Sequence, residues 1–446
     1  SSQAEVDSFP CTAVAGALQI NRAQSSTTTE TISSLSPGLD NLIRVEGQLK
    51  LDFDNPESPT TLDGLGNVTH VGSLSIKSAN QLKDISALGG LNSLGPRNCQ
   101  SATIPPDCDT QIKILSKAIT QLPAWNIAGV TSLEALTVIG LPLADPTQLD
   151  SLPVPTQSLT LEGLPLDTDQ PGQLAALARI ASAAQGQVTL KAMADVKALP
   201  TMPQTRTLVL KELGLPDLST MLIGFPALTN VSLTNLKGIS PAELAPIRDV
   251  NIVSIIDMTG LTGPNPLSGL TGGTFQRLFL NGLSGVGTLA DLSTVTNLEQ
   301  LQIKDLDALA DLDGLQNLSG ITRTLQIEQN ANLLNVDALS SLASSGVELT
   351  VSGNPALQDL DGLRGLTGTM ESVFVYNNGQ PTDISGLAGI SGVSGTVYVA
   401  QNVVTECDVL VKSRLNPQPS QSYYVDPACV YAAPTLTSSA PALDFG

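Results

Sequence analysis

The sequence predicts an α/β fold that leans strongly to β, built as a solenoid of stacked coils. Three observations support this prediction. A short strand signature recurs every 24 residues between Leu301 and Val397. Leucines follow these strands at a spacing of three, and only 3% of all residues are aromatic. A unit of this length cannot bury its apolar side alone, so its copies must stack around a thin aliphatic core.

The strand signature places two apolar residues around one outward residue, as in Leu301-Gln302-Ile303. Alternate residues of a strand point to opposite faces, so the two apolar residues face the core. The same signature opens strands at Leu18, Leu49, Leu74, Ile112, Leu136, Leu159, Val188, Leu208, Val231, Val253, Leu278, Leu301, Leu325, Leu349, Val373 and Val397. The spacing therefore predicts about sixteen coils of ~24 residues.

The segments between the strands predict short turns and a few short helices on the outer side. Apolar residues at every third position from Leu306 to Ile321 suit 3₁₀ or extended turns rather than a long α-helix. Residues 171–184 begin with proline and end before a glycine, which are helix start and stop signals. Ser240 followed by Glu243 predicts a capping box that begins another helix.

The chain divides into a long solenoid with a short segment at each end. We expect an N-terminal cap at residues 1–17 and the leucine-rich solenoid at 18–406, with an inserted Cys- and Pro-containing loop at 95–110. A C-terminal cap follows at 407–430. The tail at 431–446 is rich in Ser, Thr, Pro and Ala, a composition typical of O-glycosylated stalks.

The five cysteines predict two local disulfides and one remaining thiol. Cys99 and Cys108 share one loop, and Cys407 and Cys429 bracket the C-terminal cap, so each pair would close a short loop. Three alternatives stay open for Cys11: a free thiol, a bond that displaces one of these pairings, or a bond to another chain. Metal binding by cysteine is disfavoured, because there is no CxxC spacing and only one histidine.

Several features predict an extracellular, glycosylated protein. Asn67, Asn230 and Asn317 each begin an Asn-X-Ser/Thr tripeptide, the acceptor for N-linked glycans. The chain starts at Ser1, as a processed mature chain would. No apolar run approaches the roughly 18 residues that span a bilayer, so direct membrane insertion is not expected. A net charge of −20 argues against nucleic acid as a partner.

Individual coils resemble a known repeat type. Val71–Ile76 (VGSLSI) and residues 354–363 (NPALQDLDGL) are similar to leucine-rich repeats of the receptor L-domain type, and the resemblance covers most of residues 14–405. That type occurs in growth-factor receptor ectodomains, fungal wall proteins and surface proteins of algae and microbes. The resemblance implies a right-handed parallel solenoid with an adhesive, receptor or wall role. Dense cysteine-rich modules are lacking, so hormone-receptor function is not carried over.

Two polar ladders repeat with the coils. Asn330, Asn354, Asn378 and Asn402 each lie five residues after a strand opening. We expect these asparagines to point inward and to bond between coils and to the turn backbone.

The second ladder is acidic and leaves two explanations open. Its members are Asp311, Asn335, Asp359 and Asp383, with Asp313, Asp337 and Asp361 two residues further on. Carboxylates before a turn can accept hydrogen bonds from free N–H groups. Alternatively, Asp311, Asp313, Asp359, Asp361 and Asp383 would hold calcium, since calcium prefers oxygen ligands. No other cofactor is predicted.

The outward strand residues supply the candidate binding face. Most are small or polar: Gln19, Lys50, Ser75, Lys113, Thr137, Thr160, Thr189, Ser232, Ser254, Gln302, Gln326 and Thr350. Aromatic residues replace them at Phe279, Phe374 and Tyr398, with Tyr376 beside them. Exposed rings on a sheet can stack on sugars or anchor a protein partner. The alternative is that the C-terminal cap folds over these rings.

These features favour a non-catalytic cell-surface or matrix glycoprotein whose solenoid mediates adhesion or recognition of proteins or glycans. The alternative is a structural subunit of an extracellular fibre or cell wall that joins copies of itself end to end, because solenoid ends expose unpaired strand edges. A polysaccharide-active solenoid enzyme is a remote alternative. The chain carries no GxSxG motif, metal-binding histidine pair or phosphate loop.

Overall fold

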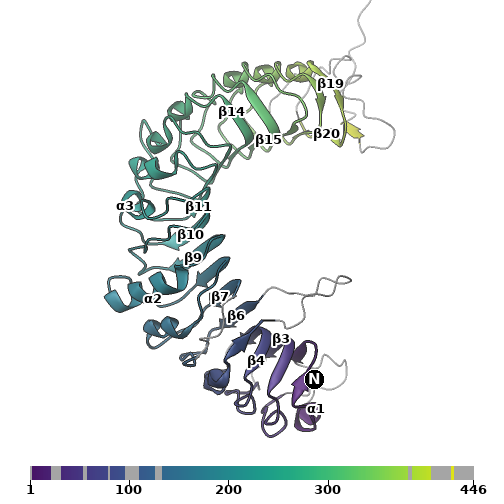
Figure 1. The fold of residues 1–446 in the computed structure, drawn as a ribbon. Coiled ribbons are helices and arrows are strands. Elements are labelled where there is room, and N and C mark those ends of the chain that lie inside the picture. Colours follow the sequence, from purple (N-terminus) through teal and green to yellow (C-terminus); the bar gives the residue numbers. More distant parts are fainter. Residues whose placement is uncertain are drawn as a thin grey trace, which may run out of the picture. The chain divides into compact units, whose positions relative to one another are not determined.

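The computed structural model describes residues 3–21, 32–53, 58–78, 81–95, 110–125, 133–379, 384–402 and 423–425. The chain forms two compact units, unit 1 with residues 1–250 and unit 2 with residues 251–446. In each unit the strands run parallel, one main strand per coil. In each unit taken by itself, the strands lie on one side and the helices and turns on the other (Figure 1).

Unit 1 begins with a short helix and then stacks its coils. Its strands are β1 (Ala13–Val14), β2 (Leu18–Asn21), β3 (Arg44–Phe53), β4 (His70–Ser78), β5 (Ser93–Leu94), β6 (Gln111–Ser116), β7 (Ala135–Ile139), β8 (Ser158–Glu162), β9 (Gln187–Met193), β10 (Thr207–Leu213) and β11 (Asn230–Thr234). Its helices are α1 (Gln3–Asp7), η1 (Ser86–Gly90), η2 (Pro146–Ser151), α2 (Pro171–Ala181), α3 (Leu218–Leu222) and η3 (Pro241–Ile247). The η elements are 3₁₀-helices.

Unit 2 is more uniform, because every helix in its described part is a single 3₁₀ turn. Its strands are β12 (Ile252–Ile256), β13 (Arg277–Asn281), β14 (Asn297–Lys304), β15 (Gly320–Glu328), β16 (Glu348–Ser352), β17 (Gly368–Met370), β18 (Ser372–Tyr376), β19 (Ile390–Val393), β20 (Val397–Ala400) and β21 (Tyr423–Val425). The 3₁₀ turns are η4 (Ser268–Leu270), η5 (Ala290–Leu292), η6 (Asp337–Leu339), η7 (Asp361–Leu363) and η8 (Ser385–Leu387). β17 and β19 pair in a small separate sheet.

The strand register confirms the predicted solenoid. Every predicted opening from Leu18 to Val397 lies in a strand, and within each unit each opening pairs with the next one along the chain. Leu301, for example, pairs with Leu325, and Leu325 with Leu349. Such parallel stacking satisfies the backbone of one coil with the next.

The core is a set of aliphatic rows. Leu301 and Ile303 are at most 1% exposed, and so are the turn leucines that follow them at every third position. Those turns close by bonds between residues three apart, such as Leu309 N to Leu306 O at 3.0 Å. This pattern confirms the 3₁₀-type turns predicted from the leucine spacing.

A left-handed residue ends most strands of unit 2. Gln329, Asn377 and Gln401 have φ near +55°, and Gly353 occupies the same position with φ +67°. The N–H of Gln329 donates to the carbonyl of the following coil at 2.9 Å. Residues with a side chain adopt this left-handed conformation at an energetic cost, whereas glycine does not. The backbone hydrogen bond to the following coil must offset this cost.

Two local predictions were corrected by the structure. The helix predicted at 171–184 exists but ends at Ala181. The segment after Ser240 forms the predicted capping box, with Ser240 N donating to Glu243 Oε2 at 2.7 Å, yet it is a 3₁₀-helix. Pro246 lies inside this helix and has no N–H to give, which disfavours α-helical bonding. Within the described residues, no helix is long and apolar enough to cross a membrane.

Candidate binding face

Side chains that point away from the core form the open face of each sheet. In unit 2 this face carries rows of residues that run from strand to strand. The middle row is Ser254, Phe279, Gln302, Gln326, Thr350, Phe374 and Tyr398. The end row, two residues further along each strand, is Ile256, Asn281, Lys304, Glu328, Ser352, Tyr376 and Ala400.

The structure brings three of the four predicted aromatic residues together. Phe374 and Tyr398 are neighbours in register on β18 and β20. The ring of Tyr376 meets that of Tyr398 edge to face, with centroids 5.5 Å apart and planes at 75°. All three side chains are half-buried. Edge-to-face contacts stabilise ring pairs, so this aromatic cluster has a defined arrangement on the open face.

Phe279 lies apart from the aromatic cluster. It occupies the same middle row, but Gln302, Gln326 and Thr350 separate it from Phe374. Four strand steps of ~4.8 Å place the two about 19 Å apart. Phe279 therefore does not contribute to the aromatic cluster.

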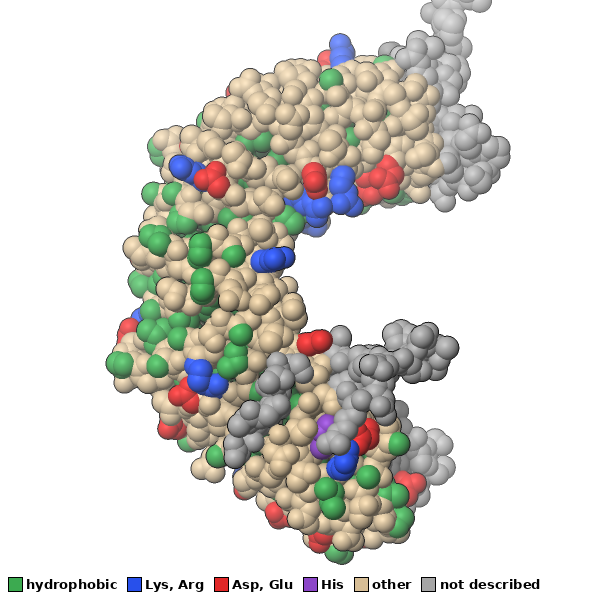
Figure 2. All heavy atoms as spheres, in the orientation of Figure 1, with side chains coloured by type: hydrophobic (Ala, Val, Ile, Leu, Met, Phe, Trp, Pro, Cys, Tyr) green, Lys and Arg blue, Asp and Glu red, His purple; other side chains and the backbone are tan. Residues whose placement is uncertain are grey.

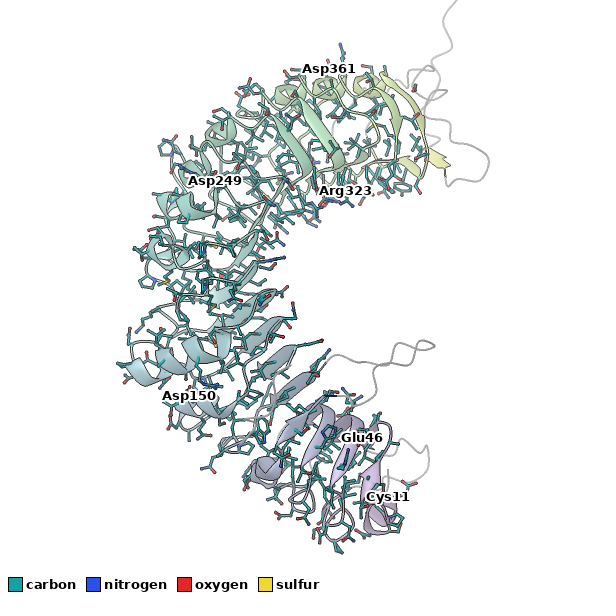
Figure 3. All side chains as sticks on the ribbon, in the orientation of Figure 1. Cys11, Glu46, Asp150, Asp249, Arg323 and Asp361 are labelled. Carbon is teal, nitrogen blue, oxygen red and sulfur yellow. The ribbon has the colours of Figure 1, made fainter. Side chains whose placement is uncertain are left out.

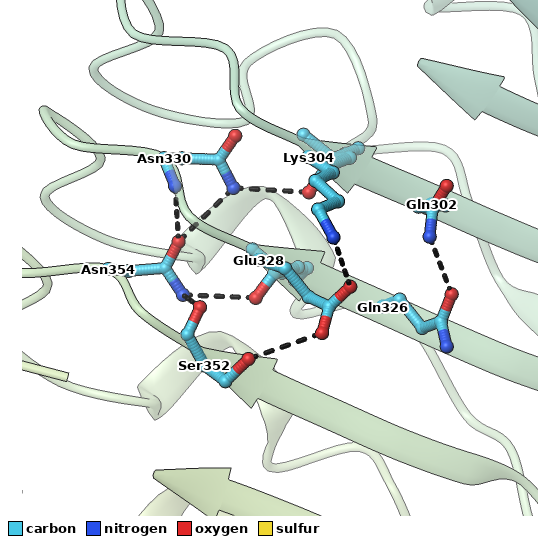
Figure 4. Close-up of polar contacts among 9 residues, drawn as sticks. Gln302, Lys304, Gln326, Glu328, Asn330, Ser352 and Asn354 are labelled. Carbon is cyan, nitrogen blue, oxygen red and sulfur yellow. Dashed lines mark hydrogen bonds and ion pairs between the residues drawn. The ribbon is translucent and has the colours of Figure 1, made fainter. Parts of the chain in front are cut away.

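Polar groups beside the cluster are bonded to one another. Gln302 Nε2 donates to Gln326 Oε1 at 2.9 Å in the middle row. In the end row, Lys304 Nζ lies 3.9 Å from Glu328 Oε2, and Ser352 Oγ donates to Glu328 Oε1 at 3.3 Å (Figure 4). These bonds fix amide, carboxylate and ammonium groups in place on the open face, so a ligand meets a pre-organised polar surface.

Short side chains on this face are covered by taller neighbours. Thr350 is only 7% exposed and Ser352 only 4%, although both point away from the core. Gln326 and Phe374 flank Thr350 in register, while Glu328 and Tyr376 flank Ser352. The face is therefore packed as well as hydrogen-bonded.

Charges on this side of unit 2 are balanced. Arg277 Nε lies 2.8 Å from Glu299 Oε2, and Lys304 pairs with Glu328 as described. Figure 2 shows basic and acidic side chains next to each other along the strand side of unit 2. A balanced surface of this kind does not select strongly for a charged ligand.

The asparagine ladder is inward and structural. Asn354 Oδ1 accepts from both the backbone N and Nδ2 of Asn330, at 3.0 and 3.1 Å, and Asn354 Nδ2 donates to Ile327 O at 3.0 Å (Figure 4). Asn378 and Asn402 repeat these bonds in the next coils. Asn330, Asn354 and Asn378 are at most 1% exposed. The ladder satisfies buried backbone groups and is unavailable to a ligand.

The acidic ladder lies on the turn side and caps turns. Asp311 Oδ1 accepts from Asp313 N at 3.0 Å, and Asp359 Oδ1 accepts from Asp361 N at 3.0 Å. Asn335 Oδ1 accepts in the same way from the N of Asp337, at 3.2 Å. Asp361 lies on the opposite side of unit 2 from the strands (Figure 3). These bonds are those expected of capping side chains.

Calcium binding by this ladder stays a prediction. In the described part of the chain, no three His, Cys, Asp or Glu residues are grouped so that they could hold a metal ion. Asp383 lies outside the described residues. The capping bonds account for Asp311 and Asp359 without an ion.

The three sequons occupy different surfaces. Asn67 and Asn317 are exposed in turns, where their Nδ2 atoms donate to the carbonyls of Asp40 and Ser293 at 2.7 and 2.8 Å. Asn230 lies on the open face of unit 1, half-buried, with Nδ2 donating to Thr207 Oγ1 at 3.2 Å. A glycan on Asn230 would therefore obstruct that face.

The cysteine predictions are largely beyond the described residues. Cys99, Cys108, Cys407 and Cys429 all lie outside them, and so does the tail at 431–446. Cys11 is exposed with a free thiol, near the start of unit 1 (Figure 3). Both predicted disulfides stay predictions.

The open face of unit 1 differs from that of unit 2, because its described residues include lysines and no aromatic ring. Its middle row is Gln19, Lys50, Ser75, Lys113, Thr137, Thr160, Thr189, Val209 and Ser232. In the end row, Lys191 Nζ lies 2.6 Å from Glu162 Oε1, and this hydrogen bond raises the pKa of Lys191 above its ordinary value.

A polar cluster around the buried His70 lies at the start of the strands at the N-terminal end of unit 1. The guanidinium of Arg44 bonds to Glu46 Oε1, and His70 Nε2 lies 3.5 Å from Glu46 Oε2. His70 Nδ1 is 2.9 Å from Ser93 Oγ, and the residue is 2% exposed. This cluster was not predicted, because its members come from three separate coils.

No protein-family model and no curated protein matches the sequence. Among solved structures, the chain is similar to a leucine-rich-repeat protein of Leptospira interrogans, with 15% identity and a TM-score of 0.44, over 88% of this chain and 100% of that one. It is also similar to an internalin from Listeria monocytogenes, with 16% identity and a TM-score of 0.33, over 94% and 88%.

The strand register, the buried leucine rows and the repeated turns together define the class. The chain is a parallel solenoid of the leucine-rich-repeat type, with its strands on one side of each unit and its turns on the other. This class fixes a scaffold, and a function has to be sought in the residues on its open faces.

Proposed function

We propose that this protein is a non-catalytic extracellular recognition protein, and that the open face of unit 2 binds a carbohydrate chain. The aromatic cluster carries the proposal. Phe374, Tyr376 and Tyr398 present rings on a sheet surface whose other groups are amides and hydroxyls. Rings cover the apolar faces of sugars, while amide groups both donate to and accept from sugar hydroxyls.

Charge and packing support an uncharged ligand. Lys304 and Glu328 neutralise each other, as do Arg277 and Glu299. Thr350 is covered by its neighbours, so the side chains on this face are packed against one another rather than mobile. Binding to such a surface loses little side-chain entropy, which favours a shallow sugar site.

The proposed location outside cells is supported by the three sequons, two of which are exposed in turns. Mass spectrometry of the protein isolated from its source tests this part directly. Glycans on Asn67 or Asn317 are expected, whereas unmodified asparagine at both positions contradicts an extracellular glycoprotein.

Binding is tested with a glycan array, followed by titration of the full chain with the neutral oligosaccharides that bind. We expect Phe374→Ala and Tyr398→Ala each to weaken binding by about tenfold or more, since a central aromatic anchor supplies much of the binding energy. Phe279→Ala is the matched control, because it removes the same ring from the same row outside the cluster. It should change affinity less than about twofold.

Two outcomes contradict the proposal. Equal losses from the Phe279 and Phe374 substitutions show that the cluster is not the site. Failure of every neutral glycan, together with cluster-dependent binding to a protein, shows that the ligand class is wrong. A screen of polysaccharide hydrolysis tests the non-catalytic part, since turnover abolished by a single Asp→Asn change refutes it.

A further inference from the structure

The open face of unit 1 holds a second surface, separate from the aromatic cluster. The Cα atoms of Lys50, Ser75 and Lys113 are aligned in register on β3, β4 and β6. Strands lie ~4.8 Å apart, so the two lysines begin about 10 Å from each other with the serine between them. Lys77 lies two residues beyond Ser75 on β4 and faces the same side. Three ammonium groups thus surround one hydroxyl.

Two of these three lysines have no carboxylate partner among the described residues. Lys77 Nζ lies 3.8 Å from Asp52 Oδ1, but no ion pair involves Lys50 or Lys113 in the described part of the chain. Lys113 is exposed and Lys50 half-buried. Positive charge therefore stays uncompensated here, in a chain whose net charge is −20.

The charge arrangement follows from where the fold places its carboxylates. Most of the described Asp and Glu residues lie outside the strands, where many cap turns. Asp84 Oδ1, for example, accepts from Ser86 N at 2.7 Å at the start of η1. Most of the described lysines, in contrast, lie on strands and face outward. Most carboxylates thus lie in turns, while the middle row of the unit 1 sheet carries lysines and no carboxylate.

Hydroxyl groups continue this row beyond the lysines. Thr137, Thr160 and Thr189 follow Lys113 in register on β7, β8 and β9. No carboxylate interrupts the middle row of unit 1 from Gln19 to Ser232. Five strand steps of ~4.8 Å give a line of ammonium and hydroxyl donors about 24 Å long between Lys50 and Thr189.

We propose that this strip, defined by Lys50, Ser75, Lys77, Lys113 and the following threonines, binds a linear polysaccharide that carries carboxylate or sulfate groups. Ammonium groups attract such anions as point charges, and the hydroxyls bond to the sugar units between them. A folded protein partner fits less well, because the described part of this row offers none of the aromatic or arginine anchors typical of protein interfaces.

The test uses the full chain and two soluble acidic polysaccharides, polygalacturonate for carboxylate and heparin for sulfate. Polyglutamate serves as an acidic polypeptide and dextran as a neutral polymer. We expect at least one acidic polysaccharide to bind and to dissociate as salt rises, because exposed charges are screened by ions. Polyglutamate should bind more weakly and dextran not at all.

Matched double substitutions locate the site. Lys50→Gln with Lys113→Gln should weaken binding by about tenfold or more, since each removes one close charge interaction. Lys83→Gln with Lys237→Gln changes the net charge equally, but these exposed lysines lie off the strands. That control should stay within about twofold of the native chain. Ser75→Glu supplies a second test, because it places one negative charge between the two lysines without removing either side chain, and it too should weaken binding.

Three results overturn the proposal: equal weakening by the two double substitutions, stronger binding of polyglutamate than of either polysaccharide, or no binding of any polyanion at low salt. None of these results bears on the neutral-glycan site in unit 2, which depends on Phe374 and Tyr398. The two proposals therefore succeed or fail separately.

Discussion

The two units share a strand in every coil but differ in the corner that follows it. Five residues after the strand opening, the coils of unit 1 that open at Leu136 and later bury an apolar side chain: Leu141, Leu164, Met193, Leu213 and Leu236. Unit 2 begins in the same way, with Met258, Leu283 and Leu306, and then changes to Asn330, Asn354, Asn378 and Asn402. The change falls where the period becomes an exact 24 residues.

Directionality explains why the corner residue and the period change together. Each corner asparagine bonds to a carbonyl 27 residues before it, and Asn330, Asn354 and Asn378 also donate to the side-chain amide oxygen of the asparagine 24 residues after them. A coil of another length would misplace these partners, because hydrogen bonds require aligned donors and acceptors. Apolar packing has no such requirement. Unit 1 therefore accommodates inserted segments such as α2, and the asparagine-bearing coils of unit 2 keep one coil length.

An exchange of corner residues tests this explanation and has the largest expected effect. Leu213→Asn buries an amide whose neighbour in the next coil is Leu236, so the amide finds no partner there. We expect a loss of about 4 kcal/mol from the lost packing and the unsatisfied group. Leu306→Asn should cost about 1–2 kcal/mol, because Asn330 in the next coil can accept its amide hydrogen.

Denaturant unfolding followed by circular dichroism, with hydrogen exchange to locate the weakened coils, measures this difference. The existing bond from Leu306 N to Asn330 Oδ1, at 3.1 Å, shows that the acceptor already faces this corner. Equal losses from the two substitutions would mean that the ladder cannot be extended, and that directionality does not set the coil length.

Removal of a ladder member is the next largest effect. Asn354→Ala leaves the buried N–H of Asn330 and the carbonyl of Ile327 without this partner. Each unsatisfied buried group costs roughly 1–3 kcal/mol, so a loss of about 3 kcal/mol is expected. Hydrogen exchange should quicken in β15 and β16 above all. Asn332→Ala is the control, since that exposed side chain makes a single bond to Asp307 O and should cost under about 1 kcal/mol.

The sequence was most informative where the coils repeat. The stacking of Leu301 on Leu325 was predicted correctly from the 24-residue period. The asparagine ladder was also predicted correctly, because it follows the same register. β21 was not predicted. It is only three residues long, it lies in the predicted C-terminal cap, and it does not continue the 24-residue period. The left-handed corner was missed as well. Gln329 and Gln401 adopt it without glycine, since stacking rather than residue preference holds them there.

Surface chemistry was harder to predict than the coils. Phe374 and Tyr398 could be placed on one face from the alternation of their strands. The ring contact between Tyr376 and Tyr398 and the isolation of Phe279 depend on distances between strands. The lysine strip of unit 1 needed the register of β3, β4 and β6, because the chain between these strands has no regular length.

A turn cap in unit 2 gives a smaller effect and separates capping from calcium binding. Asp359→Ala removes the acceptor for Asp361 N and should cost about 1 kcal/mol. Asp359→Asn keeps an oxygen acceptor and should be close to neutral. Under the capping explanation the melting midpoint is the same with calcium and with a chelator. A chelator-sensitive midpoint that Asp359→Asn abolishes would instead establish calcium.

The smallest expected effect concerns a cap in unit 1, where a helix start is held by a carboxylate. Asp217 Oδ1 accepts from Ser219 N and Thr220 N at 3.0 and 3.2 Å and from Ser219 Oγ at 2.6 Å. The hydrogen bond from the Ser219 side chain is the main cause that lowers the pKa of Asp217 below its ordinary 3.8, and the Thr220 N–H adds to it. The folded chain therefore holds this proton less tightly than the unfolded chain.

This difference gives the pH dependence its sign. A lowered pKa in the folded state stabilises the fold above the ordinary value of 3.8, and the stabilisation is lost as the pH falls through the folded-state pKa. The native chain should therefore exceed Asp217→Asn in stability at pH 6 by a margin that shrinks toward pH 3. Denaturant midpoints of the two proteins across this range measure the margin. A margin that stays constant with pH would assign the role of Asp217 to hydrogen-bond geometry alone, and acid would then weaken unit 1 through other groups.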